Sequence, residues 1–379
     1  MNDLSTYIQS NGELLQKTLQ ELCFIPAPSH NEKKRAQYCR AWLEEYGAEG
    51  VYIDEALNVV FPVNCDGSKE ITVVVAHTDT VFPDDEPMPY EDDGEKIYCP
   101  GVGDNTASLT ELLLTAKYFV EKKIKPPQGI LFVCNSCEEG LGNLKGTRQI
   151  FKDYAGRIGQ FVSFDSTFDK IADKCVGSHR YEVSVQTDGG HSYLAFGNAN
   201  AIAELSKIIC DIYGIEVPNR ENTRTSYNVG VIDGGTSVNT IAQNAKMLCE
   251  YRSDNIECLE IMEKAFESVF ERAKNRGVNV QVKRIGERPC MGKVDLEKIE
   301  KMARTCERII HETTGFDVIR ESSSTDCNIP LSLGIPALCI GVYMGAGWHT
   351  RNEWIEKNSL SLGLEVAIKI VMGLTDVCR

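Results

Sequence analysis

The sequence predicts an α/β protein: a mainly parallel sheet with helices on both faces, into which a smaller α+β domain is inserted. Two observations support this fold class. Apolar runs of strand length, such as residues 71–80 and 130–134, alternate with segments of helical periodicity, such as residues 106–123. Between residues 179 and 288 the pattern changes to half-exposed strands accompanied by two helices, which indicates a second domain within the first.

The first part of the main domain, residues 1–178, is predicted to begin with helices. Helical periodicity covers residues 4–46, with a break at Pro26 and Pro28 before a new helix near Asn31. The candidates that follow are strands at 51–54, 58–63, 71–80, 130–134 and 160–165, and a helix at 106–123. Because strands and helices alternate in this order, a mainly parallel sheet is expected.

The inserted domain, residues 179–288, has a pattern of its own. Its segments are strand, helix, strand, strand, helix and strand, which is the β-α-β-β-α-β order of ferredoxin-like domains. The main domain then resumes over residues 289–379 with a helix at 295–314, a strand at 334–343 and a terminal helix from about Ser359. The chain is therefore expected to hold two domains, one of which is split in the sequence.

The composition indicates which partners to exclude. The formal net charge is −15, and an acidic surface would repel nucleic acid and anionic membranes, so neither is expected as a partner. No uninterrupted apolar run approaches the roughly 18 residues of a membrane helix, and the opening stretch MNDLSTYIQSNG does not have the pattern of a secretory signal. We therefore expect a cytoplasmic protein whose 15 cysteines are reduced.

Side chains of the metal-ligand type occur where the predicted strands end. They are His77, Asp79, Glu138, Glu139, Asp165 and His349, with Asp104 at the entrance to the helix near residue 106. Because ligands of α/β sheets bind at the carboxyl ends of the strands, these groups are expected to lie close together. Two imidazoles and three carboxylates are typical of a paired zinc or related divalent site with one shared carboxylate. One of the two adjacent glutamates can then bind metal while its neighbour takes a proton from water.

Eight short motifs follow one another along essentially the whole chain. They are HTDTV (77–81), PGVGDNTA (100–107), CEEGLGNLKG (137–146), SFDST (163–167), GGHS (189–192), GGTSVNTIA (234–242), STDCN (324–328) and WHTRNE (348–353). Together, and in this order, they resemble the motifs of the M20 family of co-catalytic zinc aminoacyl hydrolases. That family includes peptidase T, glutamate carboxypeptidase, dipeptidases and succinyl-diaminopimelate desuccinylase. The resemblance implies a zinc exopeptidase-like catalytic domain whose inserted domain serves as a lid and as the contact of a homodimer.

The resemblance also implies a set of metal ligands. Asp104 would bridge two divalent ions, expected to be Zn²⁺, with Co²⁺ or Mn²⁺ as alternatives. His77 and Asp165 would bind one ion, and Glu139 and His349 would bind the other.

Three further residues acquire catalytic roles from the resemblance. Glu138 would be the general base that delivers metal-bound hydroxide to the scissile carbonyl. Asp79 would fix the orientation of the His77 imidazole and raise its basicity. His191, in the inserted domain, would reach the tetrahedral oxyanion, often from the partner subunit of a dimer.

Substrate-binding residues are implied as well. Asn239 and Arg252 resemble the pair that holds a substrate carboxylate, a task that suits the planar fork of arginine. Thr325 and Asp326 match a substrate-cleft motif, although the preceding serines replace the usual glycines. The expected substrate is a small peptide or an N-acyl amino acid.

Two departures from the family pattern bear on specificity. Asn105 follows Asp104 where many relatives have a second Asp, so the entrance to the helix is expected to differ in charge. Asp165 stands where carboxypeptidase-like and aminoacylase members frequently have Glu, which favours the peptidase T side of the family.

The sequence thus favours a two-zinc hydrolase that acts as an exopeptidase, in the manner of an aminopeptidase, on di- or tripeptides. An N-acyl amino acid deacylase or desuccinylase is the alternative within the same chemistry, and substrate profiling separates the two. A catalytically silent relative that binds a metal or a metabolite is a third hypothesis. The presence of all five ligands and of Glu138 argues against it.

Overall fold

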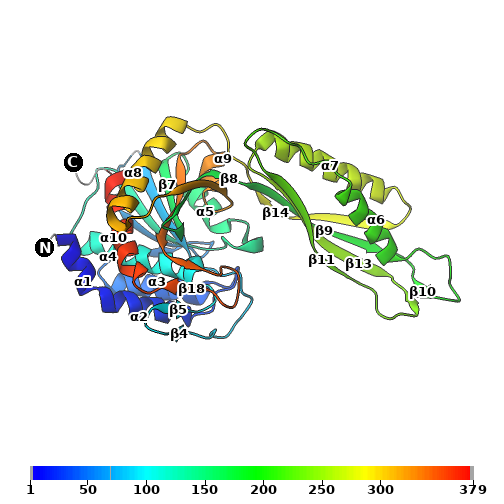
Figure 1. Cartoon of the computed structure of the whole chain (residues 1–379), viewed down its shortest axis with the longest axis horizontal. Coiled ribbons are helices and arrows are strands. Elements are labelled where there is room, and N and C mark those ends of the chain that lie inside the picture. Colours follow the sequence, from blue (N-terminus) through cyan, green and yellow to red (C-terminus); the bar gives the residue numbers. More distant parts are fainter. Residues whose placement is uncertain (1–2, 69, 376–379) are drawn as a thin grey trace. The chain divides into compact units, whose positions relative to one another are not determined.

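A computed structural model describes residues 3–68 and 70–375 of the chain. The chain forms two compact units, one made of the segments up to Cys175 and from Lys293 onward, the other of Val176–Gly292. The joins expected from the sequence lie after residues 178 and 288. The two units are called the main domain and the inserted domain (Figure 1).

The main domain is built on an eight-stranded sheet in the order β1-β2-β6-β3-β7-β16-β8-β15. Its strands are β1 (Tyr52–Ile53), β2 (Val59–Val63), β3 (Ile71–His77), β6 (Gly129–Asn135), β7 (Ile158–Thr167), β8 (Lys170–Cys175), β15 (Ile319–Ser323) and β16 (Ala337–Tyr343). The central strands β6, β3, β7 and β16 are parallel, whereas β2 and β8 pair antiparallel with their central neighbours. Every residue of β3, β6 and β16 is buried, which explains their nearly continuous apolar sequences.

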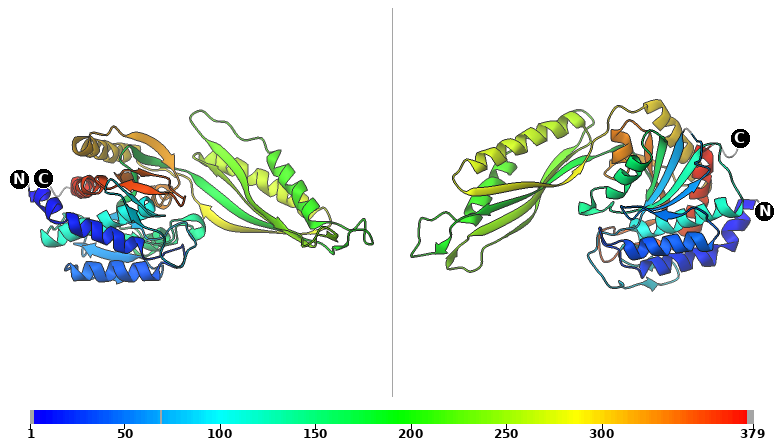
Figure 2. Two further views of the ribbon diagram at one scale, coloured as in Figure 1. Left: turned by 60° about the horizontal axis from the view of Figure 1, so that its bottom comes forward. Right: turned by 180° about the vertical axis from the view of Figure 1, so that it is seen from behind.

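Helices cover both faces of this sheet, as predicted (Figures 1 and 2). Helix α4 (Ser108–Glu121) connects β3 to β6, and α5 (Lys145–Asp153) connects β6 to β7. Because β6 and β7 lie on opposite sides of β3, the connection from β3 to β6 and the connection from β6 to β7 run in opposite directions along the sheet. Right-handed crossovers therefore place α4 and α5 on opposite faces of the sheet. The other helices of this domain are α1 (Asp3–Ser10), α2 (Gly12–Cys23), α3 (Lys33–Glu45), α8 (Leu296–Thr314), α9 (Asn328–Ser332) and α10 (Ser359–Leu374). Over residues 3–68 and 70–375, no helix has the length and apolar character needed to cross a bilayer.

Several elements of the main domain are absent from the sequence prediction. The outer strands β8 and β15 are short and carry charged residues, so they lack the apolar runs that mark the central strands. A second sheet, in the order β17-β18-β5-β4, consists of strands of two or three residues, which are too short to show a period. They are β4 (Glu91–Asp92), β5 (Lys96–Tyr98), β17 (Gly345–Ala346) and β18 (Trp354–Glu356). The helix predicted from residue 106 is preceded by a wide helical turn, η1 (Val102–Ala107).

The inserted domain has the predicted ferredoxin-like order. Its elements are β9 (Gly177–Gln186), α6 (Ala201–Tyr213), β11 (Thr225–Gly234), β13 (Asn244–Ser253), α7 (Ile256–Lys274) and β14 (Asn279–Arg288). The four strands form an antiparallel sheet in the order β11-β13-β9-β14. A small separate pair, β10 (Gly190–His191) and β12 (Thr240–Ile241), joins two loops of this domain.

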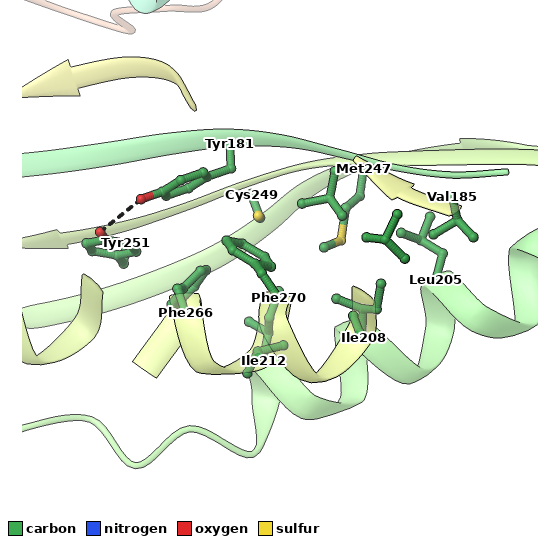
Figure 3. Close-up of a cluster of buried hydrophobic side chains, with 14 of the residues drawn as sticks. Tyr181, Val185, Leu205, Ile208, Ile212, Met247, Cys249, Tyr251, Phe266 and Phe270 are labelled. Atoms are coloured by element: carbon green, nitrogen blue, oxygen red, sulfur yellow. Dashed lines mark hydrogen bonds between the residues drawn. The ribbon is translucent and has the colours of Figure 1, made fainter. Parts of the chain in front are cut away.

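The hydrophobic core of the inserted domain lies between its sheet and its two helices (Figure 3). Met247, Cys249 and Tyr251 are alternate residues of β13, and all three are buried against residues such as Phe266 of α7. The hydroxyl groups of Tyr251 and Tyr181 lie 3.3 Å apart within this core. Burial of every second residue is the reason that these strands show a polar and apolar alternation in the sequence.

Glu111 is a buried carboxyl group of the main domain whose two oxygens have no hydrogen-bond partner within residues 3–68 and 70–375. On the same face of α4, the buried hydroxyls of Ser108 and Thr115 are also without a partner. Gly363 of α10 packs against this position, because a Cβ atom there would collide with Glu111 Oε1. Burial raises the pKa of Glu111 well above its usual value, so the fold favours the neutral acid.

Replacement of Glu111 by Gln is therefore expected to stabilise the protein at alkaline pH. Above about pH 4.3 the unfolded chain releases this proton, whereas the folded chain keeps it because its pKa is raised. The free energy of unfolding therefore falls by about 1.4 kcal/mol per pH unit until the folded pKa is reached. Glu111→Gln should unfold at higher urea than the parent at pH 8 and differ less from it at pH 5. The exposed Glu55→Gln is the control, and equal midpoints for the parent and Glu111→Gln at pH 8 would contradict the expectation.

Candidate metal centre

Five ligand-type side chains come from five separate segments at one edge of the main sheet. His77 is the last residue of β3, and Asp165 lies near the end of β7. Glu139 follows β6, Asp104 lies in η1, and His349 lies in the loop between β17 and β18. Because β3, β6 and β7 are parallel neighbours, their carboxyl ends meet, and the predicted residues are brought within reach of one another.

Asp104 lies at the middle of this cluster. Its Oδ1 atom is 3.0 Å from His77 Nε2, and its Oδ2 atom is 3.0 Å from His349 Nε2. Asp165 Oδ1 lies 3.6 Å from His77 Nε2, and Glu139 Oε1 lies 3.2 Å from His349 Nε2. The cluster therefore has two halves, each with one imidazole and one carboxylate beside a different oxygen of Asp104.

Glu138 lies within the same cluster. The ligand atoms of His77, Glu138 and Asp165 are all within 4.8 Å of one another, and so are those of His77, Asp104 and Glu139. His77 belongs to both groups. Both glutamates of the adjacent pair thus reach the cluster from one loop.

The geometry of the cluster suits divalent metal ions. Glu139 Oε1 is buried and accepts no hydrogen bond from the described residues, although His349 Nε2 is only 3.2 Å away. Two such atoms that do not bond to each other can bind a common ion. Tetrahedral ligands 2.0–2.1 Å from Zn²⁺ lie about 3.4 Å apart, which is close to the separations within each half. Nitrogen and carboxylate oxygen donors without thiolates are typical of catalytic rather than structural zinc sites.

Asp79 holds the loop that carries both glutamates. Its Oδ1 atom accepts the backbone N–H of Glu138 at 3.0 Å, and its Oδ2 atom accepts that of Glu139 at 2.9 Å. His77 Nδ1 is 3.0 Å from the backbone carbonyl oxygen of Asp79 and 3.4 Å from its carboxylate. A proton on Nδ1 directed at this carbonyl leaves His77 Nε2 free as a ligand atom. Asp79 therefore contacts both His77 and the glutamate loop.

Two residues of this edge were not indicated by the sequence motifs. Ser29 donates a hydrogen bond to Asp79 Oδ2 at 2.7 Å. Glu32 is fully buried, and its Oε1 atom accepts the backbone N–H of Cys137 at 3.1 Å. The spacing S-x-x-E resembles a helix capping box and would be assigned to the start of a helix. In the structure neither side chain caps a helix, because both bind the segments around Asp79 and Glu138.

Thr325, expected to contact substrate, is almost completely buried. Its hydroxyl accepts the backbone N–H of Cys327 at 3.2 Å, and its own N–H donates to Asn328 Oδ1 at 2.9 Å. The neighbouring Asp326 accepts hydrogen bonds from Asn135 and Thr147. Burial, assisted by the charge of Glu138, raises the pKa of Asp326 to about 7. Asp326 thus binds Asn135 at the end of β6, whereas Thr325 bonds within its own segment.

The three site residues predicted in the inserted domain have well-defined local surroundings. His191 is exposed at the end of β10, and its Nδ1 atom accepts the backbone N–H of Tyr193 at 3.3 Å. Asn239 is exposed and accepts a hydrogen bond from Ser237 at 2.8 Å. Arg252 binds both oxygens of Glu250, at 2.7 and 3.0 Å. Their roles toward substrate remain predictions.

The charge balance of the cluster shifts the pKa values of its members. Burial raises the pKa of Glu139 to about 7, and the charge of Asp104 contributes to the shift. The neighbouring carboxylates of Asp104 and Glu139 raise the pKa of His349 to about 11. Burial would raise the pKa of Asp104, but hydrogen bonds from His349 and His77 hold it below its usual value. Burial raises the pKa of Asp165 well above its usual value. Protons and metal ions therefore compete for the same atoms.

Binding of a divalent ion is expected to release protons at neutral pH. His349, with a pKa of about 11, must lose its proton to become a ligand, and Glu139, with a pKa of about 7, is partly protonated. Metal affinity should therefore rise between about pH 6 and pH 8. Calorimetric titration of chelator-treated protein with Zn²⁺, in two buffers of different ionisation enthalpy, measures the released protons. Identical apparent enthalpies in the two buffers would refute proton release.

The protein combines a largely parallel α/β sheet, ligand-type side chains at the strand ends and an inserted ferredoxin-like domain. This combination is typical of metal-dependent peptidases. The chain belongs to peptidase family M20/M25/M40, whose model matches residues 73–373.

Individual relatives are distant but cover most of the chain. Carboxypeptidase G2 of Pseudomonas sp. (strain RS-16) is 22% identical over 325 residues, which are 84% of this chain and 77% of that protein. A tripeptidase structure from Staphylococcus aureus superposes with a TM-score of 0.76 at 22% identity, over 97% of this chain and 99% of that one. A dinuclear metal-binding peptidase of the M20 family from Bacillus subtilis superposes with a TM-score of 0.65 at 15% identity, over 97% of this chain and 98% of that one. These structures share the fold of this chain.

Proposed function

We propose that this peptidase hydrolyses a peptide or amide bond of a small substrate with two divalent metal ions. The main support is the central position of Asp104, whose two oxygens each lie 3.0 Å from a different imidazole. Asp104 would bridge the ions, with His77 and Asp165 completing one site and Glu139 and His349 the other. The dinuclear peptidase with the same fold is consistent with this assignment.

The metal ions, when bound, would activate a water molecule and polarise the scissile carbonyl. The nitrogen and oxygen donors of the five ligands suit Zn²⁺, and Co²⁺ or Mn²⁺ would fit the same set. The buried acidic edge of the sheet supplies the negative charge that attracts these ions and excludes much of the solvent around them.

Glu138 is the proposed general base. Its carboxylate lies near both His77 and Asp165, and it is almost completely buried. Asp79 holds its backbone N–H, so the carboxylate is directed into the cluster from a fixed loop. In this role Glu138 takes a proton from the attacking water and returns it to the leaving amine.

The inserted domain would complete the site. His191 lies in an exposed turn and would donate a hydrogen bond to the oxyanion. Asn239 and Arg252 would hold the carboxylate of the substrate. Arg252 already binds the carboxylate of Glu250 with two nitrogens, which is the fork geometry that such a role requires. Thr325 would form part of the wall of the cleft, where its hydroxyl accepts the N–H of Cys327.

The proposed substrate is a di- or tripeptide cleaved by an exopeptidase of the peptidase T type. The likeness to a tripeptidase and the presence of Asp165 at the third strand end both favour this choice. A cytoplasmic location is proposed with it. All described cysteines are free, and all except Cys210 are buried, as suits a reducing compartment.

Hydrolysis of a substrate panel by metal-reconstituted protein tests this function. The panel contains di- and tripeptides, N-acyl amino acids and carbamoyl compounds, and we expect turnover of the peptides. Glu138→Gln should retain metal binding but lose at least about 100-fold in kcat, because general-base catalysis contributes about 10²–10⁴-fold.

The outcomes of this panel are distinct. Preferred cleavage of N-acyl amino acids would replace the exopeptidase with a deacylase or desuccinylase of the same chemistry. An unchanged rate for Glu138→Gln would mean that the base is wrongly assigned. Absence of both bound metal and amidase activity after addition of Zn²⁺, Co²⁺ or Mn²⁺ would favour a catalytically silent protein.

A homodimer through the inserted domain is proposed as the working assembly. Strand β11 forms one edge of its sheet, and within the described chain only β13 pairs with it. Val231 and Ile232 of β11 are 48% and 56% exposed, and Ile202 and Tyr213 of the nearby α6 are also exposed. A long edge strand with exposed apolar side chains is an aggregation hazard unless it is covered, and a second copy can cover it symmetrically.

Ile232→Lys is therefore expected to shift the protein from dimer to monomer in sedimentation analysis and to lower turnover if His191 acts across the dimer. The charged side chain would have to be buried at the edge of β11. Ile319→Lys, at an exposed isoleucine of the main domain, is the matched control and should leave the dimer intact. A parent protein that sediments as a monomer would contradict the proposed dimer.

A further inference from the structure

Glu353 is a fully buried carboxylate that connects the loops of two proposed ligands. It lies four residues after His349, in the segment that leads into β18. The role of this glutamate is not explained by the five ligands or by the base, although it ends the motif WHTRNE.

The carboxylate of Glu353 is occupied by backbone N–H groups of a single loop. Its Oε2 atom accepts the N–H of Gly101, and its Oε1 atom accepts those of Gly103 and Asp104, each at 2.8 Å. Three N–H groups bound to one side chain fix the backbone of this loop at Gly101, Gly103 and Asp104.

The position of Glu353 is itself fixed by the adjacent small sheet. The backbone carbonyl of Glu353 accepts the N–H of Cys99, and the next residue, Trp354, pairs with Tyr98 of β5. The backbone next to Glu353 and the backbone next to Cys99 are therefore both anchored by the pairing of β18 with β5. The side chain of Glu353 bridges from this anchor to the loop of Asp104.

A second close contact joins the same two segments. A Cβ atom on Gly103 would lie 2.8 Å from the Tyr343 hydroxyl and 3.1 Å from Glu353 Oε1, so only glycine allows this approach. The Tyr343 hydroxyl accepts a hydrogen bond from Trp348 Nε1 at 2.9 Å. Trp348 directly precedes His349. The loop of Asp104 thus touches the segment of His349 at two places, Glu353 and Tyr343.

We infer that Glu353 is a positioning residue that sets the separation between the bridging carboxylate of Asp104 and the imidazole of His349. This inference rests on the proposed metal centre, but only on its capacity to bind divalent ions. Without the carboxylate, the backbone at Asp104 would lose its anchor, and Oδ1 and Oδ2 would no longer be held toward the two halves of the cluster. Both metal ions would then bind more weakly, because both depend on Asp104.

The test is the metal affinity of Glu353→Gln, measured without any substrate. Glutamine has the same size, but its NH₂ group cannot accept an N–H, so at least one of the three hydrogen bonds is lost. Chelator-treated protein is titrated with Co²⁺ against a competing chelator while the visible absorption of the bound ion is recorded. We expect Glu353→Gln to bind Co²⁺ about 10–100-fold more weakly than the parent, with an altered absorption spectrum.

Glu111→Gln is the matched control, because Glu111 is equally buried but, among the described residues, its carboxyl oxygens form no hydrogen bond to a loop of the metal centre. It should bind Co²⁺ with the affinity and the spectrum of the parent. Thermal unfolding of each metal-free variant separates a change in affinity from a change in stability. A Glu353→Gln variant that is only less stable, with parental affinity and spectrum, would show that Glu353 serves the fold alone and would overturn the inference.

Glu353→Asp covers the case in which the glutamine variant does not fold. The shorter side chain retains the charge but cannot reach all three N–H groups at once, so its affinity should also fall below that of the parent. Parental Co²⁺ affinity in a folded Glu353→Asp variant would then reject the inference. Failure of the parent itself to bind Co²⁺ would instead contradict the proposed function, so the two failures are distinguishable.

Discussion

The main domain is organised by a concentration of negative charge at one edge of its sheet. Asp104, Glu138, Glu139 and Asp165 converge there with the imidazoles of His77 and His349. Buried like charges repel one another strongly unless protons or cations balance them. Burial raises the pKa values of Glu139 and Asp165, and repulsion from the charges of Asp104 and Glu138 adds to both shifts. A fold that tolerates such an arrangement is suited to binding divalent ions, and family membership agrees with that use.

A second set of carboxylates keeps the first in place. Asp79, Glu32 and Glu353 are buried, and each accepts N–H groups from the backbone of a loop that carries a ligand or the proposed base. The loops at this edge contain glycines and residues at positive φ, so few of their N–H groups can be satisfied by regular secondary structure. The carboxylates accept hydrogen bonds from these N–H groups, and they thereby also determine where the loops of Asp104, Glu138 and Glu139 lie.

The sequence allowed the central strands, the ferredoxin-like insertion and the edge of the candidate site to be predicted, because these depend on local periodicity and on motifs. The outer strands β8 and β15 and the small sheet around β18 escaped prediction, since their short, charged segments are fixed by pairing rather than by pattern. The contacts of Ser29, Glu32 and Glu353 escaped for a different reason. Their partners lie far away in the sequence, and no spacing rule connects, for example, Glu353 with Gly101. The surroundings of Thr325 likewise became visible only in three dimensions.

The position of the inserted domain in the sequence also determines the order in which the proposed ligands are synthesised. Four of the proposed ligands precede the inserted domain, whereas His349 and the anchoring Glu353 follow it near the C-terminal end. A chain emerging from the ribosome therefore holds four of the five proposed ligands, but not His349, while the inserted domain is being made and folds as a unit. The proposed centre can therefore reach its final geometry only after the inserted domain and the segment that carries His349 have been made.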